Sequence, residues 1–256
     1  MIKKRIIGVI NVLNGWAVQS FGYKKYLPLG RPTNLAKNLE NWGADEIFIN
    51  SIDRSRKNLG PDLELLNLLS ELSLTTPLIY GGGISSVKDA EECIKIGCER
   101  ITIDSLLHYE PDSIKEISYK LGKQSLIANI PLSVVNNKLF WFNYLKNNLQ
   151  DNFSTIKKIA SENLISEFLL IDKKNEGERK SFDNEIINLF PIKDKPLIIF
   201  GGISEKEQLK NLLSLDSIAA VGIGNFLNYK EHMIQFYKQY VNRQDIRMPY
   251  FSEDLN

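Results

Sequence analysis

Short hydrophobic runs rich in β-branched residues alternate along the chain with longer segments in which hydrophobic residues recur every three or four positions. The short runs have the pattern of strands and cover residues 5–10, 46–50, 77–80, 100–104, 125–130, 167–171, 196–200 and 217–223. The longer segments have the pattern of helices and include residues 34–42, 62–72, 87–96, 154–162 and 206–213. This regular alternation predicts parallel strands joined by helical crossovers.

The two halves of the chain also resemble each other. The turn Gly82-Gly83-Ile84-Ser85 recurs as Gly201-Gly202-Ile203-Ser204, and each copy follows a Pro-Leu-Ile strand. The next segment, 105–109, matches 225–229, again directly after a strand. Two halves of four βα units each predict a single (β/α)8 TIM barrel domain over residues 1–256, with a half-barrel (βα)4 internal repeat. An open doubly wound sheet is the alternative, although it does not require equivalent halves.

The charge balance and the cysteines exclude several classes of partner. The chain has 32 Lys and Arg against 31 Asp and Glu, and this net charge of +1 provides no field that would attract nucleic acid or an anionic membrane. No apolar run approaches the roughly 20 residues of a membrane helix, and the N-terminal run lacks a cleavage site. Cys93 and Cys98 fit neither a disulfide framework nor metal-ligand spacing, which favours the cytoplasm. With only two histidines, we expect no metal site, and we expect no cofactor.

Glycines directly after the strands indicate where an anion would bind. In barrels of this type the ligand contacts come from the loops that follow the strands. A phosphate that approaches backbone N–H groups needs residues without Cβ atoms, and the first turn of a following helix adds its positive end. Two cradles for a phosphorylated small molecule are therefore expected on opposite sides of the barrel mouth, from Gly201, Gly202, Gly224 and Asn225 and from Gly82, Gly83 and Ser105. The alternative is that these glycines only form tight turns.

Residues spread over nearly the whole chain match a known family in order and spacing. They are Arg5, Gly15, Asp45-Glu46, Gly81-Gly82-Gly83-Ile84, Glu167, Gly177, Asp183, Gly201-Gly202 and Gly224-Asn225-Phe226. In this set the chain resembles the cyclase subunit of imidazole glycerol phosphate synthase, HisF. The related isomerase of the same pathway shares the half-barrel repeat but is a weaker match. The resemblance implies a (β/α)8 barrel and adds Gly177 to the expected phosphate site.

The resemblance also implies a general acid and a general base, which are aspartates at the ends of the first and fifth strands in the family. In this chain the two positions hold Asn11 and Pro131, and neither side chain can transfer a proton as a carboxylate does. Asp104 and Glu176 are candidates for a replacement acid and base pair. The alternative is that these two acids are solvated loop charges.

At the opposite end of the barrel, the family admits ammonia from a separate glutaminase past a ring of two basic and two acidic residues. The four corresponding positions all keep their charge in this chain and are Arg5, Glu46, Arg100 and Glu167. The resemblance therefore implies an ammonia gate and a HisH-like glutaminase partner at the N-terminal barrel face. A structural salt-bridge plug is the alternative, because residues at this face usually serve stability. Glu99, beside Arg100, corresponds to an acidic position at the glutaminase interface.

Two segments are long for loops between a strand and a helix. Residues 14–30 contain several glycines and prolines without a clear periodicity, so we expect either a lid over the catalytic rim or a surface loop. Residues 136–152 are expected to form a second excursion after the fifth strand, for which the sequence suggests no role.

Three functions are consistent with these observations. The leading hypothesis is a HisF-like synthase subunit of a glutamine amidotransferase that receives ammonia and binds a phosphorylated ligand, with the amidation of a surface sugar as its specialised form. The second is the ordinary imidazole glycerol phosphate synthase cyclase, a lyase of histidine biosynthesis, with relocated acid and base groups. The third is a catalytically silent barrel that binds and activates a glutaminase.

Overall fold

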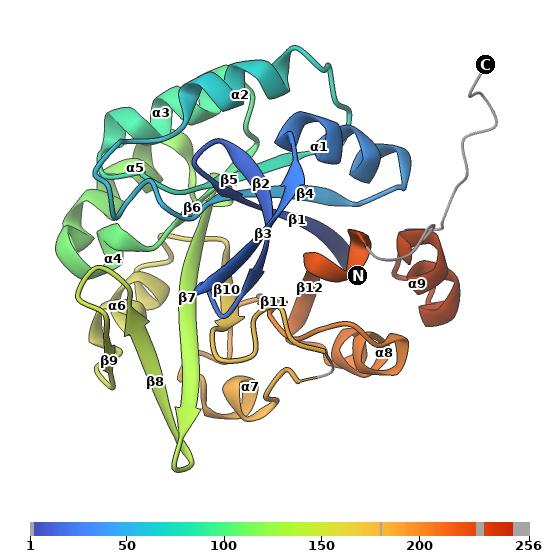
Figure 1. The fold of residues 1–256 in the computed structure, drawn as a ribbon. Coiled ribbons are helices and arrows are strands. Elements are labelled where there is room, and N and C mark those ends of the chain that lie inside the picture. The colour runs from blue at the N-terminus through green and yellow to red at the C-terminus, as the bar shows by residue number, and fades with distance from the viewer. Residues whose placement is uncertain (1–2, 180, 229–232, 248–256) are drawn as a thin grey trace.

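The computed structural model describes residues 3–179, 181–228 and 233–247. Within these residues, eight parallel strands close into a barrel in which β12 pairs with β1 and β10 pairs with β7 (Figure 1). In order around the barrel, the strands are β1 (Arg5–Leu13), β4 (Glu46–Ser51), β5 (Leu78–Gly81), β6 (Arg100–Ile103), β7 (Leu126–Val135), β10 (Glu167–Asp172), β11 (Leu197–Phe200) and β12 (Ile218–Ile223). The predicted (β/α)8 barrel is confirmed. Residue 229, which ends the second copy of the repeated 105–109 segment, lies outside the described residues.

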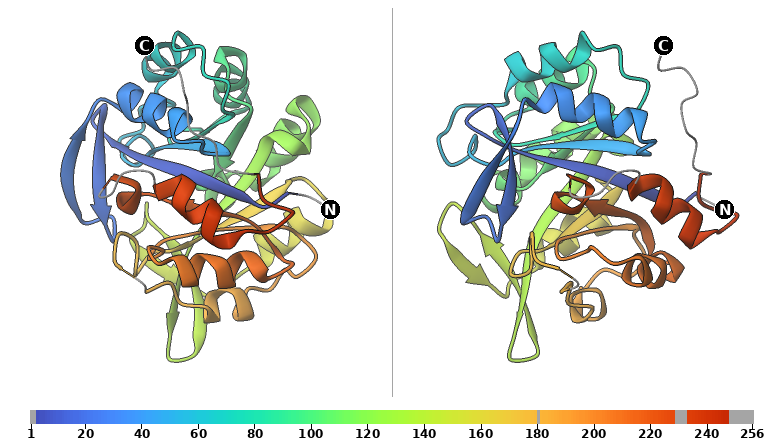
Figure 2. Two further views of the ribbon diagram at one scale, coloured as in Figure 1. Left: turned by 90° about the vertical axis from the view of Figure 1, so that its right-hand side faces the viewer. Right: turned by 45° about the vertical axis from the view of Figure 1, so that its right-hand side comes forward.

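Helices cover the outside of the barrel between successive strands (Figure 2). They are α1 (Pro32–Asn41), α2 (Leu63–Ser70), α3 (Val87–Ile96), α4 (Ser105–Tyr109), α5 (Pro111–Leu121), α6 (Ser154–Ser161), α7 (Glu185–Leu189), α8 (Lys206–Ser214) and α9 (Met233–Val241), with short 3₁₀ helices η1 (Lys123–Ser125) and η2 (Asn225–Asn228). The bounds of α3 agree with the prediction because both ends carry strong signals. Ser86 caps the helix by accepting a hydrogen bond from the Asp89 amide at 3.1 Å, and Gly97 ends it with a φ of 131°.

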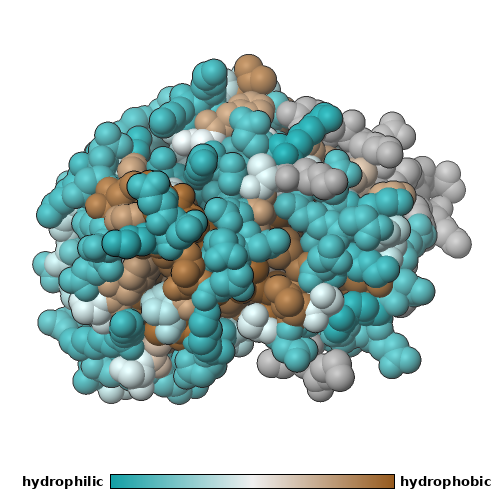
Figure 3. Space-filling model, turned by 90° about the horizontal axis from the view of Figure 1, so that it is seen from below, coloured by the Kyte–Doolittle hydropathy of each residue, from teal (hydrophilic) through white to brown (hydrophobic). Residues whose placement is uncertain are grey.

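Alternation of side chains along the strands divides the core into two parts. In β1, Ile6 and Ile10 pack toward the outer helices, whereas Ile7 and Val9 belong to the cluster inside the barrel. The other members of the interior cluster are Phe48, Ile79, Ile127, Leu169, Ile171, Ile198, Phe200 and Ala220. The barrel axis is therefore a packed apolar core and not an open pore. The face seen in Figure 3 is largely hydrophilic, with hydrophobic residues gathered near its middle.

Both long excursions are antiparallel hairpins that continue the barrel strands, so residues 14–30 contain two strands although the sequence shows no clear periodicity there. After β1, the chain forms β2 (Trp16–Phe21) and β3 (Lys25–Gly30). After β7, it forms β8 (Lys138–Asn143) and β9 (Asn148–Gln150). The hairpins follow the first strand of each half-barrel, so the internal repeat extends into them.

The first turn of each hairpin explains why the strands reverse direction. Asn14 and Gly15 have φ values of 52° and 78°, and Asn136 and Asn137 have φ values of 50° and 60°. Two consecutive residues with positive φ form the tight turn that matches the twist of a hairpin, and asparagine and glycine tolerate this conformation best.

Among the described residues, no helix has both the length and the hydrophobicity that a membrane span requires.

Candidate functional site

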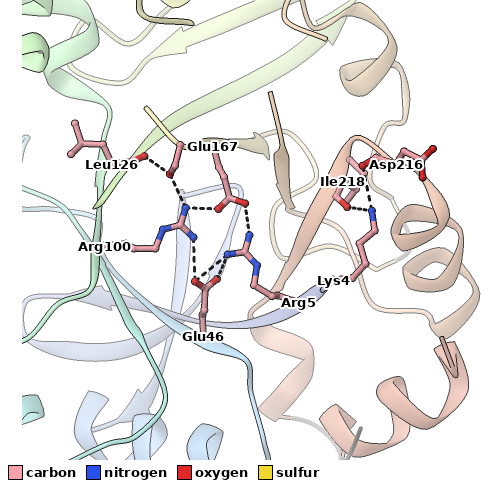
Figure 4. Close-up of polar contacts among 9 residues, drawn as sticks. Lys4, Arg5, Glu46, Arg100, Leu126, Glu167, Asp216 and Ile218 are labelled. Atoms are coloured by element: carbon pink, nitrogen blue, oxygen red, sulfur yellow. Dashed lines mark hydrogen bonds and ion pairs between the residues drawn. The ribbon is translucent and has the colours of Figure 1, made fainter. Parts of the chain in front are cut away.

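Four charged side chains form a closed ring of ion pairs across the N-terminal end of the barrel (Figure 4). Arg5, Glu46, Arg100 and Glu167 are the first residues of β1, β4, β6 and β10. The Nη1 atoms of both arginines lie 3.2 Å from Glu46 carboxylate oxygens, and both Nη2 atoms donate to Glu167. Positive and negative charges therefore alternate around the ring, and each side chain contacts two of opposite sign.

The ring is largely removed from water. The side chains of Glu46 and Glu167 are 7% and 10% exposed, and those of Arg100 and Arg5 are 12% and 22% exposed. Burial raises the pKa of Glu46, while Arg5 and Arg100 act in the opposite direction. Desolvating these charges is expensive, so the ring depends on all of its pairs being present.

A small apolar cavity lies on the barrel axis between this ring and the C-terminal face. Its volume is about 10 Å³, which is close to the space that one water molecule needs. Its lining consists of Ile7, Val9, Phe48, Ile79, Thr102, Ile127, Leu169, Ile198 and Gly222. A molecule the size of ammonia fits here, whereas larger molecules do not.

The glycines predicted to bind phosphate form two separate cavities at the C-terminal end of the barrel. Gly82, Gly83 and Ser105 line the first cavity, which has a volume of about 50 Å³. The second has a volume of about 10 Å³, and among the predicted residues its lining includes Gly177, Gly201, Gly202, Gly224 and Asn225. The structure thus brings each predicted set together, and phosphate binding by either set remains a prediction.

Equivalent glycines of the two cavities have similar conformations and similar neighbours. Gly82 and Gly201 have φ values of 120° and 104°, and Gly83 and Gly202 have φ values of 75° and 68°. A Cβ atom on Gly82 would overlap the backbone oxygen of Ser51, and one on Gly201 would lie 2.6 Å from the backbone oxygen of Asp172. These positions require glycine because a Cβ atom fits neither the backbone conformation nor the space.

A larger pocket of about 190 Å³ opens at the same face of the barrel. The two hairpins form part of its wall, through Gly22, Tyr23 and Lys24 on one side and Phe142, Tyr144 and Asn147 on the other. The remaining lining residues are Asn50, Ile52, Arg56, Asp104, Asn129, Pro131, Ile171 and Lys173. This central pocket adjoins the Gly82–Gly83 cavity, because five residues, Asn50, Ile52, Asp104, Asn129 and Tyr144, line both.

The two positions that hold aspartates in the resembled family have different surroundings. Pro131 lines the central pocket, whereas Asn11 is 3% exposed and lies in a hydrogen-bonded chain. Asn11 Oδ1 accepts from Asn50 Nδ2 at 2.8 Å, and Asn11 Nδ2 donates to Glu176 Oε1 at 3.2 Å. Asn11 is thus a fixed structural link between two strands and a loop.

Glu176 holds the β2–β3 hairpin against the barrel. Its side chain accepts hydrogen bonds from Ser20 Oγ at 2.8 Å and from the Tyr23 amide at 3.2 Å, in addition to that from Asn11. The residue is 1% exposed, and burial raises its pKa despite these hydrogen bonds. Asn225 makes a second link, because its amide group exchanges two hydrogen bonds with the backbone of Ser20. Glu176 therefore faces the hairpin and the small second cavity, not the central pocket.

We expect Glu176→Ala to release the hairpin from the barrel. The change removes three hydrogen bonds and leaves buried donors on Asn11 and Ser20 without a partner. Hydrogen exchange of the amides in residues 16–30 should accelerate by about tenfold or more. Glu178→Ala, which changes an exposed neighbour on the same loop, is the control. Equal exchange rates in the two variants would contradict the role assigned to Glu176.

Restoring the family's aspartate at position 11 should destabilise this protein. Asn11→Asp places a second carboxyl group beside Glu176 in a buried site. We expect a loss of about 1–3 kcal/mol in the free energy of unfolding at pH 7.5. The loss should shrink at pH 5, because one carboxyl group then takes up a proton and the repulsion disappears. Urea unfolding at both pH values measures the loss of stability. The control is Asn188→Asp, which places a carboxyl group beside Glu185 in an exposed pair.

Asp104 is the acid that faces the central pocket. Its side chain is 12% exposed, its Oδ1 atom is buried without a hydrogen-bond partner, and burial raises its pKa well above the usual range. His108 Nε2 lies 3.7 Å away, but burial lowers the pKa of His108 to about 4, which disfavours an ion pair between the two side chains. A protonated carboxyl group in a pocket can donate a proton to a bound ligand.

Sequence reasoning did not identify most of the central pocket. Asp53, another nearby acid, forms an ion pair in which its Oδ2 atom lies 2.6 Å from Lys57 Nζ, and it does not line the central pocket. Tyr23 and Tyr144 come from the second turns of the two hairpins, and burial is the main cause that raises the pKa of each. Tyr23 and Tyr144 occupy equivalent positions in the two half-barrels, so the internal repeat could have identified both tyrosines. Among the described residues, no group of three or more His, Cys, Asp or Glu side chains could hold a metal ion.

A closed (β/α)8 barrel with an ionic ring at one end and two matched glycine cavities at the other defines a half-barrel repeat protein. Comparison of sequences identifies the family. The chain belongs to the histidine biosynthesis protein family, whose model matches residues 5–233.

Several relatives match almost the whole chain. The imidazole glycerol phosphate synthase subunit HisF of Campylobacter concisus is 26% identical over 249 residues, which cover 96% of this chain and 97% of that protein. HisF of Pyrococcus furiosus is 28% identical over 251 residues, which cover 96% and 98%. A Vibrio vulnificus protein designated hisF2 is 28% identical over 235 residues, which cover 91% and 86%. These relatives confirm the resemblance to HisF.

Proposed function

We propose that this protein is a HisF-like synthase subunit that receives ammonia from a separate glutaminase at its N-terminal face and adds it to a phosphorylated acceptor at its C-terminal face. The observation that carries the proposal is the ring of Arg5, Glu46, Arg100 and Glu167, which crosses the barrel axis directly below an apolar cavity of ammonia size. A ring needed only for stability requires no cavity behind it. The HisF names of the relatives support the same division of labour.

The path for ammonia begins at the partly exposed Arg5 and ends near Thr102, which lines both the axial cavity and the Gly82–Gly83 cavity. Ammonia is neutral and small, so it crosses an apolar layer that excludes ions and larger solutes. The ring must open one of its pairs for each passage, since all four pairs are closed in this structure. Glu99, which is exposed beside Arg100, is a contact that we assign to the glutaminase.

The acceptor differs from the usual precursor of imidazole glycerol phosphate. Asn11 cannot act as a general acid or base, and its two hydrogen bonds to Asn50 and Glu176 fix it in place. Pro131 has no polar side-chain atom. Asp104 is the proton donor that we assign to the new reaction, because its unpartnered oxygen lies in the wall of the central pocket. A surface sugar is the acceptor in the specialised form of this proposal.

Two assays test the proposal, one with the glutaminase present and one with the barrel alone. The glutaminase subunit encoded in the same genome is mixed with this barrel, and glutamine hydrolysis is measured with and without it. In parallel, the barrel is supplied with ammonium chloride and the phosphorylated precursor of imidazole glycerol phosphate. We expect stimulated hydrolysis in the first assay and no cyclisation in the second. Absence of both complex formation and stimulation would overturn the proposal.

The same assays separate the remaining functions. Formation of imidazole glycerol phosphate would identify an ordinary cyclase with relocated acid and base groups. A third assay supplies ¹⁵N-amide glutamine and an extract of small phosphorylated metabolites. Stimulated glutaminase activity without ¹⁵N in any phosphorylated product would identify a silent barrel that only activates its partner.

A further inference from the structure

The central pocket carries positive charge that the protein itself does not neutralise. Lys24, Arg56 and Lys173 all line this pocket. Within residues 3–179, 181–228 and 233–247, none of the three side chains forms an ion pair with a carboxylate. Three like charges around one pocket repel each other, so the arrangement favours a bound anion.

The acids near the pocket contact other groups, or burial favours their neutral form. Asp53 is paired with Lys57 at 2.6 Å, and Glu176 accepts hydrogen bonds from the β2–β3 hairpin. Burial raises the pKa of Asp104, which favours the neutral form of this carboxyl group. The positions where the resembled family has two aspartates hold Asn11 and Pro131, so their negative charges are also missing from this face.

Aromatic rings hold two of the cations in place. The Lys173 ammonium group lies 4.1 Å from the centroid of the Phe142 ring, and the Arg56 guanidinium lies 5.9 Å from that of Tyr144. Burial lowers the pKa of Lys173, the positive charges of Lys24 and Arg56 lower it further, and the negative charge of Glu176 acts in the opposite direction. An anion between the three side chains would relieve this repulsion.

The central pocket adjoins the Gly82–Gly83 cavity, so one ligand can reach both. Five residues line both this pocket and the Gly82–Gly83 cavity, so one ligand can occupy the two spaces together. We propose that the central pocket binds a second anionic group, a carboxylate or a phosphate, of a sugar phosphate whose first phosphate lies in the Gly82–Gly83 cavity. This inference rests on the proposed function, which places the phosphate of the acceptor at the C-terminal face. It narrows the acceptor class to sugar phosphates with a second negatively charged group.

A matched series of ligands tests this inference by calorimetric titration of the intact chain at constant ionic strength. Glucitol 6-phosphate has one anionic group, 6-phosphogluconate adds a carboxylate at the other end, and glucitol 1,6-bisphosphate adds a phosphate there. We expect at least one of the doubly anionic compounds to bind about tenfold more tightly than glucitol 6-phosphate, because its second group makes charge-assisted hydrogen bonds. The compound that gains more identifies the group as carboxylate or phosphate.

Lys173→Gln should reduce this gain, because it removes one of the three positive charges that line the pocket. Lys174→Gln removes the same charge from an exposed neighbour that does not line the pocket, and it should keep the gain. Equal affinities for the three compounds, or equal effects of the two variants, would overturn the inference. If glucitol 6-phosphate binds and inorganic phosphate displaces it, that result leaves the proposed function intact. If none of the compounds binds, the inference fails together with the phosphate site of the proposed function, while stimulation of the glutaminase still tests the ammonia gate.

Discussion

Replacement of Arg100 by methionine is expected to lower the free energy of unfolding by about 3–5 kcal/mol at pH 7.5. In the wild-type protein, Glu46 and Glu167 each contact two guanidinium groups. Without Arg100, both carboxylates share Arg5, although their side chains are only 7% and 10% exposed. A buried carboxylate that loses a partner keeps its desolvation cost, and this uncompensated cost is the main source of the loss.

The pH dependence of this loss has a defined sign. Burial already raises the pKa of Glu46 in the wild-type protein, and removal of Arg100 raises it further because Arg100 favours the ionised form. The folded variant therefore binds protons more readily than its unfolded chain, which makes the penalty largest above the raised pKa. The difference in stability between the variant and the wild type should shrink as the pH falls from 7.5 toward 5. Urea unfolding of both proteins across this range measures the difference.

Two controls distinguish the ring from an ordinary ion pair. Lys120→Met removes a surface partner of Glu91, whose ion pair is 3.0 Å long, and should cost less than about 1 kcal/mol. The double change of Arg100→Met with Glu167→Met leaves Arg5 paired with Glu46 and should recover much of the stability. A loss for Arg100→Met no greater than that for Lys120→Met would show that the ring is not a coupled, desolvated unit.

The barrel could be predicted from the sequence because strong and regular signals determine it. Strands such as β4 and β10 are buried on both faces, so they read as short continuous hydrophobic runs. The repeated Gly-Gly turns have positive φ values and backbone contacts that only glycine permits, so the same residues occur in both halves. The ring charges were identified by the resemblance to the family, and each stands at the first position of its strand.

The hairpins and the central pocket could not be predicted in the same way. Residues 16–30 contain Gly22, Pro28 and Gly30, which suggested a loop, and their pairing depends on the extension of β1 beyond the barrel. The pocket gathers Lys24, Arg56 and Lys173 from three separate connections, and no sequence pattern brings their charges together. Glu176 was a candidate acid or base by position alone, whereas its hydrogen bonds to Ser20 and Tyr23 tie it to the hairpin.

Gly83→Ala should have the second largest effect, with a loss of about 3 kcal/mol in the free energy of unfolding. Gly83 has a φ of 75°, and a Cβ atom here would overlap the backbone oxygen and carbon of Gly60. Gly60 cannot move aside easily, because Arg54 Nε donates a hydrogen bond to the Gly60 backbone oxygen at 2.9 Å. Arg54 Nη2 also donates to the backbone oxygens of the two neighbours, Leu59 and Pro61. The added methyl group therefore strains both loops that form the Gly82–Gly83 cavity.

Gly15→Ala separates the effect of conformation from the effect of crowding. Gly15 has almost the same φ, 78°, but a Cβ atom there would meet nothing within 4 Å. This variant should lose only about 1 kcal/mol, the cost of placing alanine in a left-handed conformation. Inorganic phosphate should raise the melting temperature of the wild type and of Gly15→Ala equally, and it should raise that of Gly83→Ala by less, because only the Gly82–Gly83 cavity is altered. Equal losses of stability in the two variants would mean that the loop of Gly60 yields freely, and an unchanged response to phosphate in Gly83→Ala would place the anion elsewhere.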